Sequence, residues 1–446
     1  MNFTRNTITL LAFLGILGSC HQPHDELTGK TEITKWKDNK KGAISLTYDD
    51  GTINQFTVAL PIMNKIGFPG TFYIVTGKIP GSENRGKFIG RDPGEIIAET
   101  SQQPTGADNF FERASAIGFT GQEGALEYHT NAGSRIDAGN AEEAYRIIDE
   151  GYEKIRKGEM KKSDAIDYNH YTTDTTTWED IQQYAAQGHE FGSHTITHPR
   201  LAALDEANML YELEKSREDI LNNLGKEYTF SAECPYGTEN ERVMEYAHKI
   251  YPALRNRMPE TWLEELNRGS KVNPGESSKE YVQWQRGPVK KVSMEMMKSW
   301  VDTLLVHDNI WLVLVFHGVD DIGWEARTGA ELEEYFGYMK EREDDLWVAT
   351  FAEVTKYLRE RKAAEIKTVV EDDLIKVDVT HSLDREWYNI PLTLKTYVPS
   401  DWSVASLKMP DGETLEKPVN SDESGSYLLY ECLPGKGQVV IEKLEK

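Results

Sequence analysis

The chain has 446 residues and a formal net charge of −24. That length exceeds one ordinary hydrophobic core, so we expect two domains or one domain with large insertions. The negative charge argues against nucleic acid as a partner, because phosphate binding needs a basic footprint. It also offers no electrostatic attraction to an anionic lipid surface. A neutral or weakly charged partner such as a sugar fits the composition better.

The N-terminus has the pattern of an export signal. Arg5 precedes an apolar run over residues 8–17, which is too short to span a bilayer. Residues 17–20 (Leu-Gly-Ser-Cys) resemble a bacterial lipobox, in which the cysteine becomes the lipidated first residue. We therefore expect a signal peptide over residues 1–19, an exported lipoprotein anchored at Cys20, and a polar tether over residues 20–40. A plain secretory signal is the alternative, and membrane attachment would come only from the lipid anchor.

Apolar runs of strand length alternate with helical patterns along the next part of the chain. The expected strands are residues 43–48, 71–75, 190–193, 228–230, 311–316 and 346–349. Helix start signals lie between them. Asp205 is a typical N-cap, and capping boxes are expected at Thr176 with Glu179, at Thr328 with Glu331 and at Thr350 with Glu353. The alternation predicts an α/β fold with a parallel sheet covered by helices. We expect a distorted (β/α) barrel of about seven strands over residues 41–364.

Two stretches interrupt this alternation, and the pattern of apolar and polar residues changes near the C-terminus. Residues 78–175 are rich in Gly, Asp and Glu and partly helical around residues 141–156, and residues 256–282 are irregular. We expect both to be insertions on the loop side of the barrel. Residues 365–446 alternate apolar and polar side chains, which predicts a small β-sandwich domain. We expect a tight turn at residues 411–412 and a final hairpin formed by residues 427–431 and 439–441. The remaining cysteines, Cys234 and Cys432, lie in different regions and are expected to be buried thiols.

Reactive side chains follow four of the expected strands at their carboxyl ends. In barrel-like α/β folds, active sites assemble at that face. The residues concerned are Asp49 and Asp50 after the first strand, His194 and His198 after residues 190–193, Tyr236 within Pro-Tyr-Gly, and His317 after residues 311–316.

Each of these signals has an ordinary structural explanation when it is taken alone. Asp-Asp-Gly is a common turn sequence, and a single histidine after a buried strand is more often structural than catalytic. His194 and His198 are four residues apart and would share one face of a helical turn, the spacing of a two-histidine metal site. With a carboxylate they make a three-ligand set that leaves positions open for water and substrate.

Taken together, these motifs resemble the polysaccharide deacetylases of carbohydrate esterase family four. The matching stretches are residues 46–51, 69–73, 188–199, 235–237 and 315–317. The resemblance covers roughly residues 41–364, with residues 78–175 outside it. It implies a hydrolase that removes N-acetyl or O-acetyl groups from a polysaccharide or oligosaccharide. The alternatives are a non-catalytic carbohydrate-binding lipoprotein and a glycoside hydrolase, although the latter needs two carboxylates across a glycosidic bond.

The resemblance also implies a role for each candidate residue. Asp50, His194 and His198 would be the ligands of a divalent metal ion, Zn²⁺ first, with Co²⁺, Mn²⁺ or Ni²⁺ as alternatives. Asp49 would be the general base, and His317 the general acid that protonates the leaving group.

The resemblance further places the backbone N–H of Tyr236 at the oxyanion. The chain departs from the family in the residues that support the site. Many members carry an arginine just before Pro-Tyr-Gly, where this chain has Glu233 and its neighbours. Arg255 or Arg286 could replace that arginine from another loop. The aspartate that tunes the acid histidine has no obvious counterpart, and the nearby candidates are Asp320 and Asp321.

Overall fold

The computed structural model describes residues 27–163, 176–237, 240–372 and 374–444. They form two compact units, a larger one within residues 34–364 and 381–393 and a smaller one from residues 27–33, within 365–380 and from 394–444. The predicted signal peptide, lipobox and Cys20 anchor lie outside the described residues. Among the helices of the described ranges, none is long and apolar enough to cross a bilayer.

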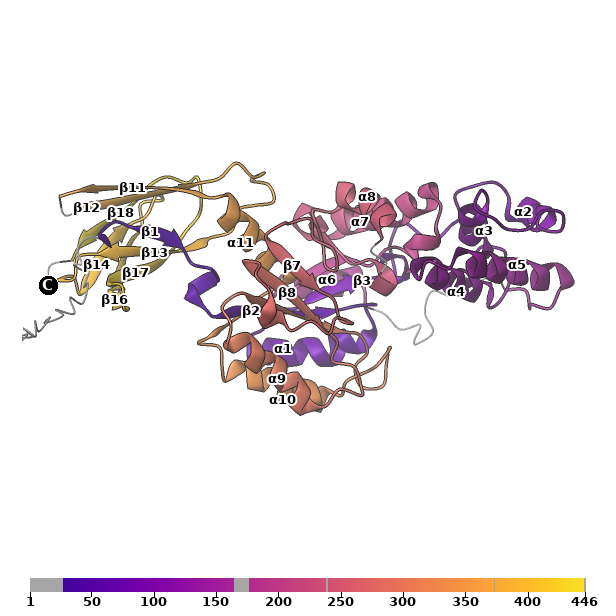
Figure 1. Ribbon diagram of the computed structural model, residues 1–446, viewed down its shortest axis with the longest axis horizontal. Coiled ribbons are helices and arrows are strands. Elements are labelled where there is room, and N and C mark those ends of the chain that lie inside the picture. Colours follow the sequence, from indigo (N-terminus) through magenta and orange to yellow (C-terminus); the bar gives the residue numbers. More distant parts are fainter. Residues whose placement is uncertain (1–26, 164–175, 238–239, 373, 445–446) are drawn as a thin grey trace, which may run out of the picture. The chain divides into compact units, whose positions relative to one another are not determined.

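One curled parallel sheet organises the larger unit (Figure 1). Its strand order is β6-β5-β4-β3-β2-β9-β8-β7, and β10 pairs with the first part of β2. The strands are β2 (Gly42–Tyr48), β3 (Thr71–Ile74), β4 (Glu190–Ser193), β5 (Ser231–Ala232), β6 (Ala253–Leu254), β7 (Leu263–Leu266), β8 (Tyr281–Arg286), β9 (Ile310–Phe316) and β10 (Leu346–Val348). Strand β2 lies near the middle, between β3 and β9, and the sheet has open ends at β6 and β7. The predicted distorted α/β barrel is therefore confirmed as an open half-barrel.

Helices cover the outer face of this sheet. They are α1 (Leu60–Ile66), α6 (Trp178–Ala185), α7 (Glu206–Leu224), α8 (Glu241–Ile250), α9 (Met294–Leu305), α10 (Gly329–Lys340) and α11 (Phe351–Ala363). All of β9 is buried, as expected for a central parallel strand covered on both faces. Asp205 caps α7 and Thr328 with Glu331 forms a capping box, both as predicted. The box at α6 lies one residue later than predicted, at Thr177 and Asp180.

Two sequence-based expectations within this sheet are wrong. Residues 226–229, expected to overlap a strand, form a 3-10 turn, and β5 begins only at Ser231. Residues 256–282, expected to be an irregular insertion, contain β7 and the start of β8. The side chains of Gln283 and Gln285 in β8 both donate to the backbone oxygen of Arg255 inside the unit. The polar inner face of β8 hides the apolar pattern by which a buried strand is recognised.

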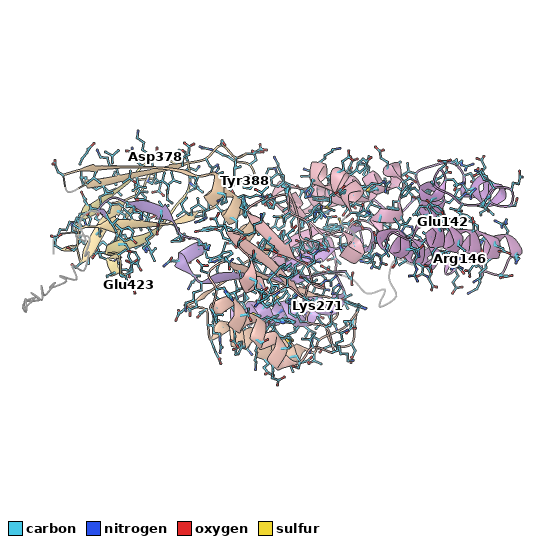
Figure 2. The ribbon with its side chains drawn as sticks, viewed as in Figure 1. Glu142, Arg146, Lys271, Asp378, Tyr388 and Glu423 are labelled. Carbon is cyan, nitrogen blue, oxygen red and sulfur yellow. The ribbon has the colours of Figure 1, made fainter. Side chains whose placement is uncertain are left out.

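Residues 78–175, as far as they are described, form a helical layer with its own apolar cluster. Its helices are α2 (Pro93–Glu99), α3 (Phe110–Ile117), α4 (Ala125–Asp137) and α5 (Ala141–Lys157). Glu142 and Arg146 lie on the exposed side of α5 (Figure 2). Helix α4 packs against the turn over residues 201–203 at Gly133, where an added Cβ would lie 3.1 Å from the Cβ of Ala203. This insertion therefore packs on the chain that directly follows His198.

The smaller unit consists of two antiparallel sheets, ordered β1-β13-β17-β16 and β11-β12-β18-β14-β15. Its strands are β1 (Thr31–Ile33), β11 (Glu365–Glu371), β12 (Leu374–Thr380), β13 (Leu392–Val398), β14 (Val404–Lys408), β15 (Thr414–Pro418), β16 (Asn420–Ser421), β17 (Ser426–Cys432) and β18 (Val439–Lys443). Strand β1 falls within the predicted tether, so that part of the segment is ordered against β13.

The connections of the smaller unit differ from expectation at its end. Strands β17 and β18 lie in different sheets, so the predicted final hairpin is wrong. The predicted tight turn at residues 411–412 does join β14 to β15, and Gly412 has a φ of 93° that favours glycine. Cys234 and Cys432 are buried thiols, as predicted.

The buried carboxylate of Glu190 ties β4 to its neighbours and gives a test of this fold. It accepts hydrogen bonds from Thr71 Oγ1 (2.9 Å), from the hydroxyl of Ser231, and from the backbone N–H of Ala352 (2.9 Å) in the first turn of α11. We expect Glu190→Ala to lower the free energy of unfolding by about 2–4 kcal/mol, because three buried donors lose their acceptor. Urea unfolding measures this, with the exposed Glu341→Ala as control. Equal losses in both variants would contradict the assignment.

Candidate metal centre

The register of the parallel strands brings the candidate residues to one edge of the sheet. Tyr48 in β2 is level with Phe316 in β9, so the next residues, Asp49 and His317, emerge side by side. Ile74 in β3 is level with Ser193 in β4, which places His194 at the same edge. The backbone N–H of Asp49 bonds to the oxygen of Phe316 at 3.0 Å, which extends the pairing to the site itself. The carboxyl ends of the strands therefore assemble the cluster.

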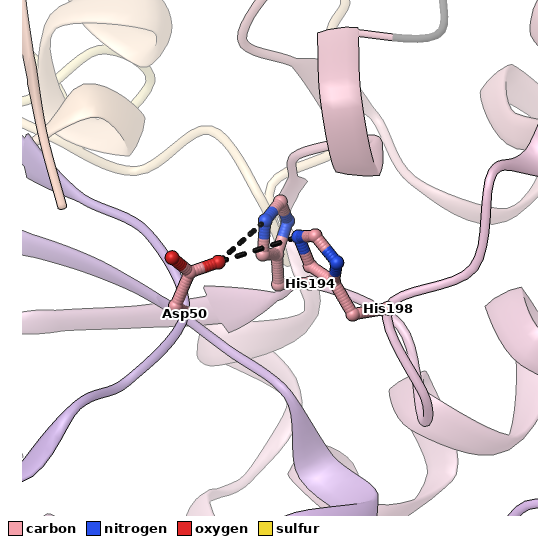
Figure 3. Close-up of side chains that lie close together, drawn as sticks. All are labelled: Asp50, His194 and His198. Atoms are coloured by element: carbon pink, nitrogen blue, oxygen red, sulfur yellow. Dashed lines mark ion pairs between the residues drawn. The ribbon is translucent and has the colours of Figure 1, made fainter. Parts of the chain in front are cut away.

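Asp50, His194 and His198 point at one another (Figure 3), and their candidate ligand atoms all lie within 4.8 Å. The Nε2 atoms of His194 and His198 are 3.7 and 3.3 Å from Oδ1 of Asp50. Two ligand atoms that each lie about 2.1 Å from a tetrahedral Zn²⁺ are about 3.4 Å apart. The spacing and the donor types, two imidazoles and a carboxylate, fit a divalent metal ion.

The imidazole of His194 is oriented and kept neutral, as a metal ligand must be. Its Nδ1 lies 2.9 Å from the backbone oxygen of Glu233, so Nδ1 carries the proton and Nε2 presents its lone pair toward Asp50. Burial lowers the pKa of His194 to about 4, and the neighbouring His198 adds to this. Burial alone would raise the pKa of Asp50, but the adjacent His198 imidazole holds it far below its usual range. The set therefore pairs an ionised carboxylate with at least one neutral imidazole.

The two histidines converge through a tight loop and not, as the spacing suggested, through a helical turn. Thr195 and His198 have φ values of 66° and 59°, in the left-handed region that non-glycine residues rarely adopt. The carboxylate of Glu212 in α7 holds this loop by accepting from the backbone N–H groups of Ile196 and Thr197, both at 2.9 Å. The Thr197 hydroxyl donates to the same carboxylate at 2.7 Å. Glu212 was not identified from the sequence, because only the tertiary fold brings α7 to this loop.

Arg255 supplies the guanidinium that the motif comparison left unassigned. It is fully buried and donates to both oxygens of Asp49 at 2.7 Å. It also donates to Thr47 Oγ1 at 2.8 Å and lies 3.0 Å from Oε1 of Glu233. Burial alone would raise the pKa of Asp49, but Arg255, with His317 and His194, lowers it to about 2. Asp49 is thus an ionised carboxylate in a fixed orientation.

The residue that stands where many family members have arginine is itself an acid. Glu233 is buried, and burial raises its pKa although Arg255 opposes the shift. The amide of Asn256 donates to the same carboxylate. The other candidate, Arg286, stacks on Trp284 with 4.6 Å to the ring centroid and donates to backbone oxygens. The structure therefore places Arg255, and not Arg286, on Asp49.

His317 pairs with Asp49 and not with the aspartates suggested from the sequence. Its Nε2 is 3.5 Å from Oδ2 of Asp49, and burial lowers its pKa while the Asp49 and Asp50 carboxylates oppose that shift. Asp320 accepts from the backbone N–H of Gly329 at 2.8 Å, and Asp321 is an exposed residue 3.9 Å from Lys290.

The amide of Gln55, also missed in the sequence, donates to the backbone oxygens of both Asp49 and His317. This side chain therefore ties the end of β2 to the end of β9.

Tyr236 lies beside the cluster in a left-handed conformation, with a φ of 62°. Its ring centroid is 4.7 Å from that of His198. The guanidinium carbon of Arg200 lies 4.3 Å from the same Tyr236 ring centroid. The ring of Tyr236 is therefore adjacent to the candidate ligand His198, and the role of the Tyr236 backbone N–H at an oxyanion stays a prediction. The ring of Phe316 stacks on that of Tyr48, with 5.0 Å between the ring centroids, so Phe316 is a core residue.

A family model supports the resemblance that the sequence motifs indicated. A family model described as polysaccharide deacetylase matches residues 143–251, a segment that includes His194, His198 and Tyr236. The resemblance to that family is thereby confirmed. A gellan lyase from Bacillus sp is 27% identical over 283 residues, which cover 58% of this chain and 11% of that relative. The chain thus spans only a small part of the length of this relative.

Two solved structures are also similar to the chain. One is a peptidoglycan N-acetylglucosamine deacetylase with 14% identity and a TM-score of 0.35, covering 70% of this chain and 86% of that one. The other is a family 4 carbohydrate esterase from Bacillus anthracis with 13% identity and a TM-score of 0.33, covering 77% of this chain and 94% of that one.

The arrangement around Arg255 predicts a large loss of stability when the guanidinium is removed. In Arg255→Met, Asp49 and Glu233 would remain buried without their shared cation, so we expect the free energy of unfolding to fall by about 3–5 kcal/mol. Arg286→Met is the matched control, and we expect it to lose about 1 kcal/mol, the size of an exposed cation–π contact. Chemical unfolding of both variants measures the difference. Comparable losses would show that Arg255 has no special role.

Proposed function

We propose that this protein, whose residues 143–251 match the polysaccharide deacetylase family model, removes acetyl groups from a polysaccharide or oligosaccharide. The bond cleaved would be an N-acetyl amide or an O-acetyl ester. The observation that carries the proposal is the convergence of Asp50, His194 and His198 beside an ionised Asp49. A carbohydrate-binding protein without turnover would need neither that ligand set nor a carboxylate held by a buried guanidinium.

Asp50, His194 and His198 would hold the metal ion in this proposal. Bound there, a divalent ion supplies Lewis-acid polarisation of the acetyl carbonyl and lowers the pKa of water. A donor set of two imidazoles and one carboxylate suits Zn²⁺ first, with Co²⁺, Mn²⁺ and Ni²⁺ as alternatives. Three protein ligands leave coordination positions for water and substrate, as a catalytic site requires.

Asp49 and His317 would divide the proton transfers between them. Asp49 is ionised at neutral pH, and its Oδ2, the oxygen nearest His317, would accept a proton from the attacking water. Arg255 lowers the basicity of this carboxylate but fixes its direction, which favours a single productive geometry. His317 Nε2 lies 3.5 Å from the same oxygen and would deliver a proton to the leaving nitrogen or oxygen. The backbone N–H of Tyr236 would stabilise the oxyanion.

The proposed site of action is outside the cytoplasm. The apolar run over residues 8–17 followed by Cys20 supports export as a lipoprotein anchored at that cysteine. Polymeric acetylated glycans are found outside the cytoplasm, so the predicted export and the proposed substrate class agree.

Metal content tests the ligand assignment. We expect purified protein to contain about one divalent ion per chain, and His194→Ala to lose most of it because one of three ligands is gone. Inductively coupled plasma mass spectrometry after dialysis measures this, and His307→Ala, in the turn after α9, is the control that should keep the metal. Equal metal content in the two variants would refute the site.

Acetate release tests the role of Asp49. We expect Asp49→Asn to keep the metal while acetate release from acetylated glycans falls at least about 100-fold, the contribution of a positioned general base. The exposed Asp344→Asn should release acetate at the original rate. Loss of metal in Asp49→Asn would mean that the roles of Asp49 and Asp50 are exchanged.

A further inference from the structure

Two aromatic side chains beside the cluster are exposed to solvent, although large aromatic side chains usually bury most of their surface. Trp324 is 43% exposed and Tyr236 is 44% exposed. Each touches a histidine of the site edge-on, with 4.8 Å between the ring centroids of Trp324 and His317 and 4.7 Å between those of Tyr236 and His198. Each aromatic ring therefore contacts a histidine of the site and is also accessible from the solvent.

The sheet order places these two rings on opposite sides of the site. Tyr236 follows β5 and Trp324 follows β9, while β4, β3 and β2 lie between those strands. Four interstrand spacings measure about 19 Å along a sheet. Asp50 follows β2 and His194 follows β4, so the candidate metal ligands arise between the two aromatic residues. A chain that extends from one aromatic residue to the other would therefore pass over the candidate metal ligands.

The loop that carries Trp324 is built to hold it in this position. The backbone N–H of Gly318 donates to the oxygen of Trp324 at 2.9 Å, which folds the loop back onto its own start. The crossing is possible because two glycines meet: a Cβ on Gly323 would lie 2.7 Å from Cα of Gly318. The buried Arg327 closes the loop, with its N–H donating to the oxygen of Gly318 and its side chain to the oxygen of Pro288.

The indole ring of Trp324 takes no part in the hydrogen bonds that close its loop. The loop keeps its shape through backbone hydrogen bonds and a buried arginine, none of which involves the indole ring. The ring contact recorded for Trp324 within the described residues is the one with His317. The indole ring is in contact with His317 and still 43% exposed, so a ligand can cover its free surface.

We propose that Trp324 is a sugar-stacking residue, and that with Tyr236 it makes the site specific for a chain of at least two pyranose units. This rests on the proposed function. The C–H faces of a pyranose ring are apolar and its hydroxyl rim is polar, so the flat ring of tryptophan can cover the former while water solvates the latter. The sugar on Trp324 would lie on the His317 side of the acetyl group, next to the leaving atom.

The experiment compares wild type, Trp324→Ala and Trp324→Phe on three probes. The probes are an N-acetylglucosamine pentamer, an acetylated xylose oligomer, and 4-nitrophenyl acetate, which carries no sugar. For Trp324→Ala we expect KM for the oligosaccharide that is turned over to rise about tenfold, which corresponds to about 1.4 kcal/mol of binding. Its metal content should not change, its kcat/KM for 4-nitrophenyl acetate should fall much less than that for the oligosaccharide, and Trp324→Phe should recover most of the affinity. Trp262→Ala, before the amino end of β7, is the matched control and should behave as wild type.

Binding measured by calorimetry separates this proposal from the function on which it rests. If wild type releases no acetate from any probe, the proposed deacetylase function fails, but a Kd for either oligosaccharide that rises about tenfold in Trp324→Ala still supports the stacking role. An unchanged KM and Kd in a folded Trp324→Ala protein overturn the proposal. Absence of oligosaccharide binding by wild type overturns it as well, and so does an equal loss on 4-nitrophenyl acetate, which would show general damage to the site.

Discussion

The site depends on one buried guanidinium. Arg255 has no exposed surface, and it lies between Asp49 and Glu233, two carboxylates that are themselves buried. An isolated ionised carboxylate is costly to bury, so Asp49 can remain charged only because a cation reaches both of its oxygens. The same contact fixes where Asp49 meets His317, and the peptide of Glu233 in turn orients His194. The orientation of Asp49, His317 and His194 is therefore linked to a single side chain.

Several residues of the site have strained backbone conformations, and residues outside the site stabilise these conformations. Asp50, Thr195, His198 and Tyr236 all have positive φ values, which cost of order 1–3 kcal/mol for non-glycine residues. Such conformations persist where their surroundings over-determine them. Around Thr195 and His198 this is done by the carboxylate of Glu212. As a result, the imidazoles of His194 and His198 both face Oδ1 of Asp50. The sequence had predicted a regular helical turn for this arrangement.

Whether a strand could be predicted depended on whether its inward-facing side chains are apolar or polar. Strands β2 and β9 are buried along their whole length; β9 is a continuous apolar run, and only Ser45 and Thr47 interrupt the apolar pattern of β2. Strand β8 carries glutamines toward Arg255, and β7 carries two glutamates between two leucines, so neither has the pattern of a buried strand. The final hairpin failed for a different reason: β17 and β18 are adjacent in sequence but pair in separate sheets, and pairing is a tertiary choice.

The sequence by itself determined the type of fold and the residues that stand at the ends of its strands. Asp49, Asp50, His194 and His317 could be found because each directly follows a strand, and parallel strands end at one edge. The tertiary structure alone decided what supports them. Arg255 meets Asp49 from 206 positions away, and Gln55 meets His317 across 262 positions. Local pattern cannot encode such contacts, because a polar side chain that faces the interior looks in the sequence like one that faces water.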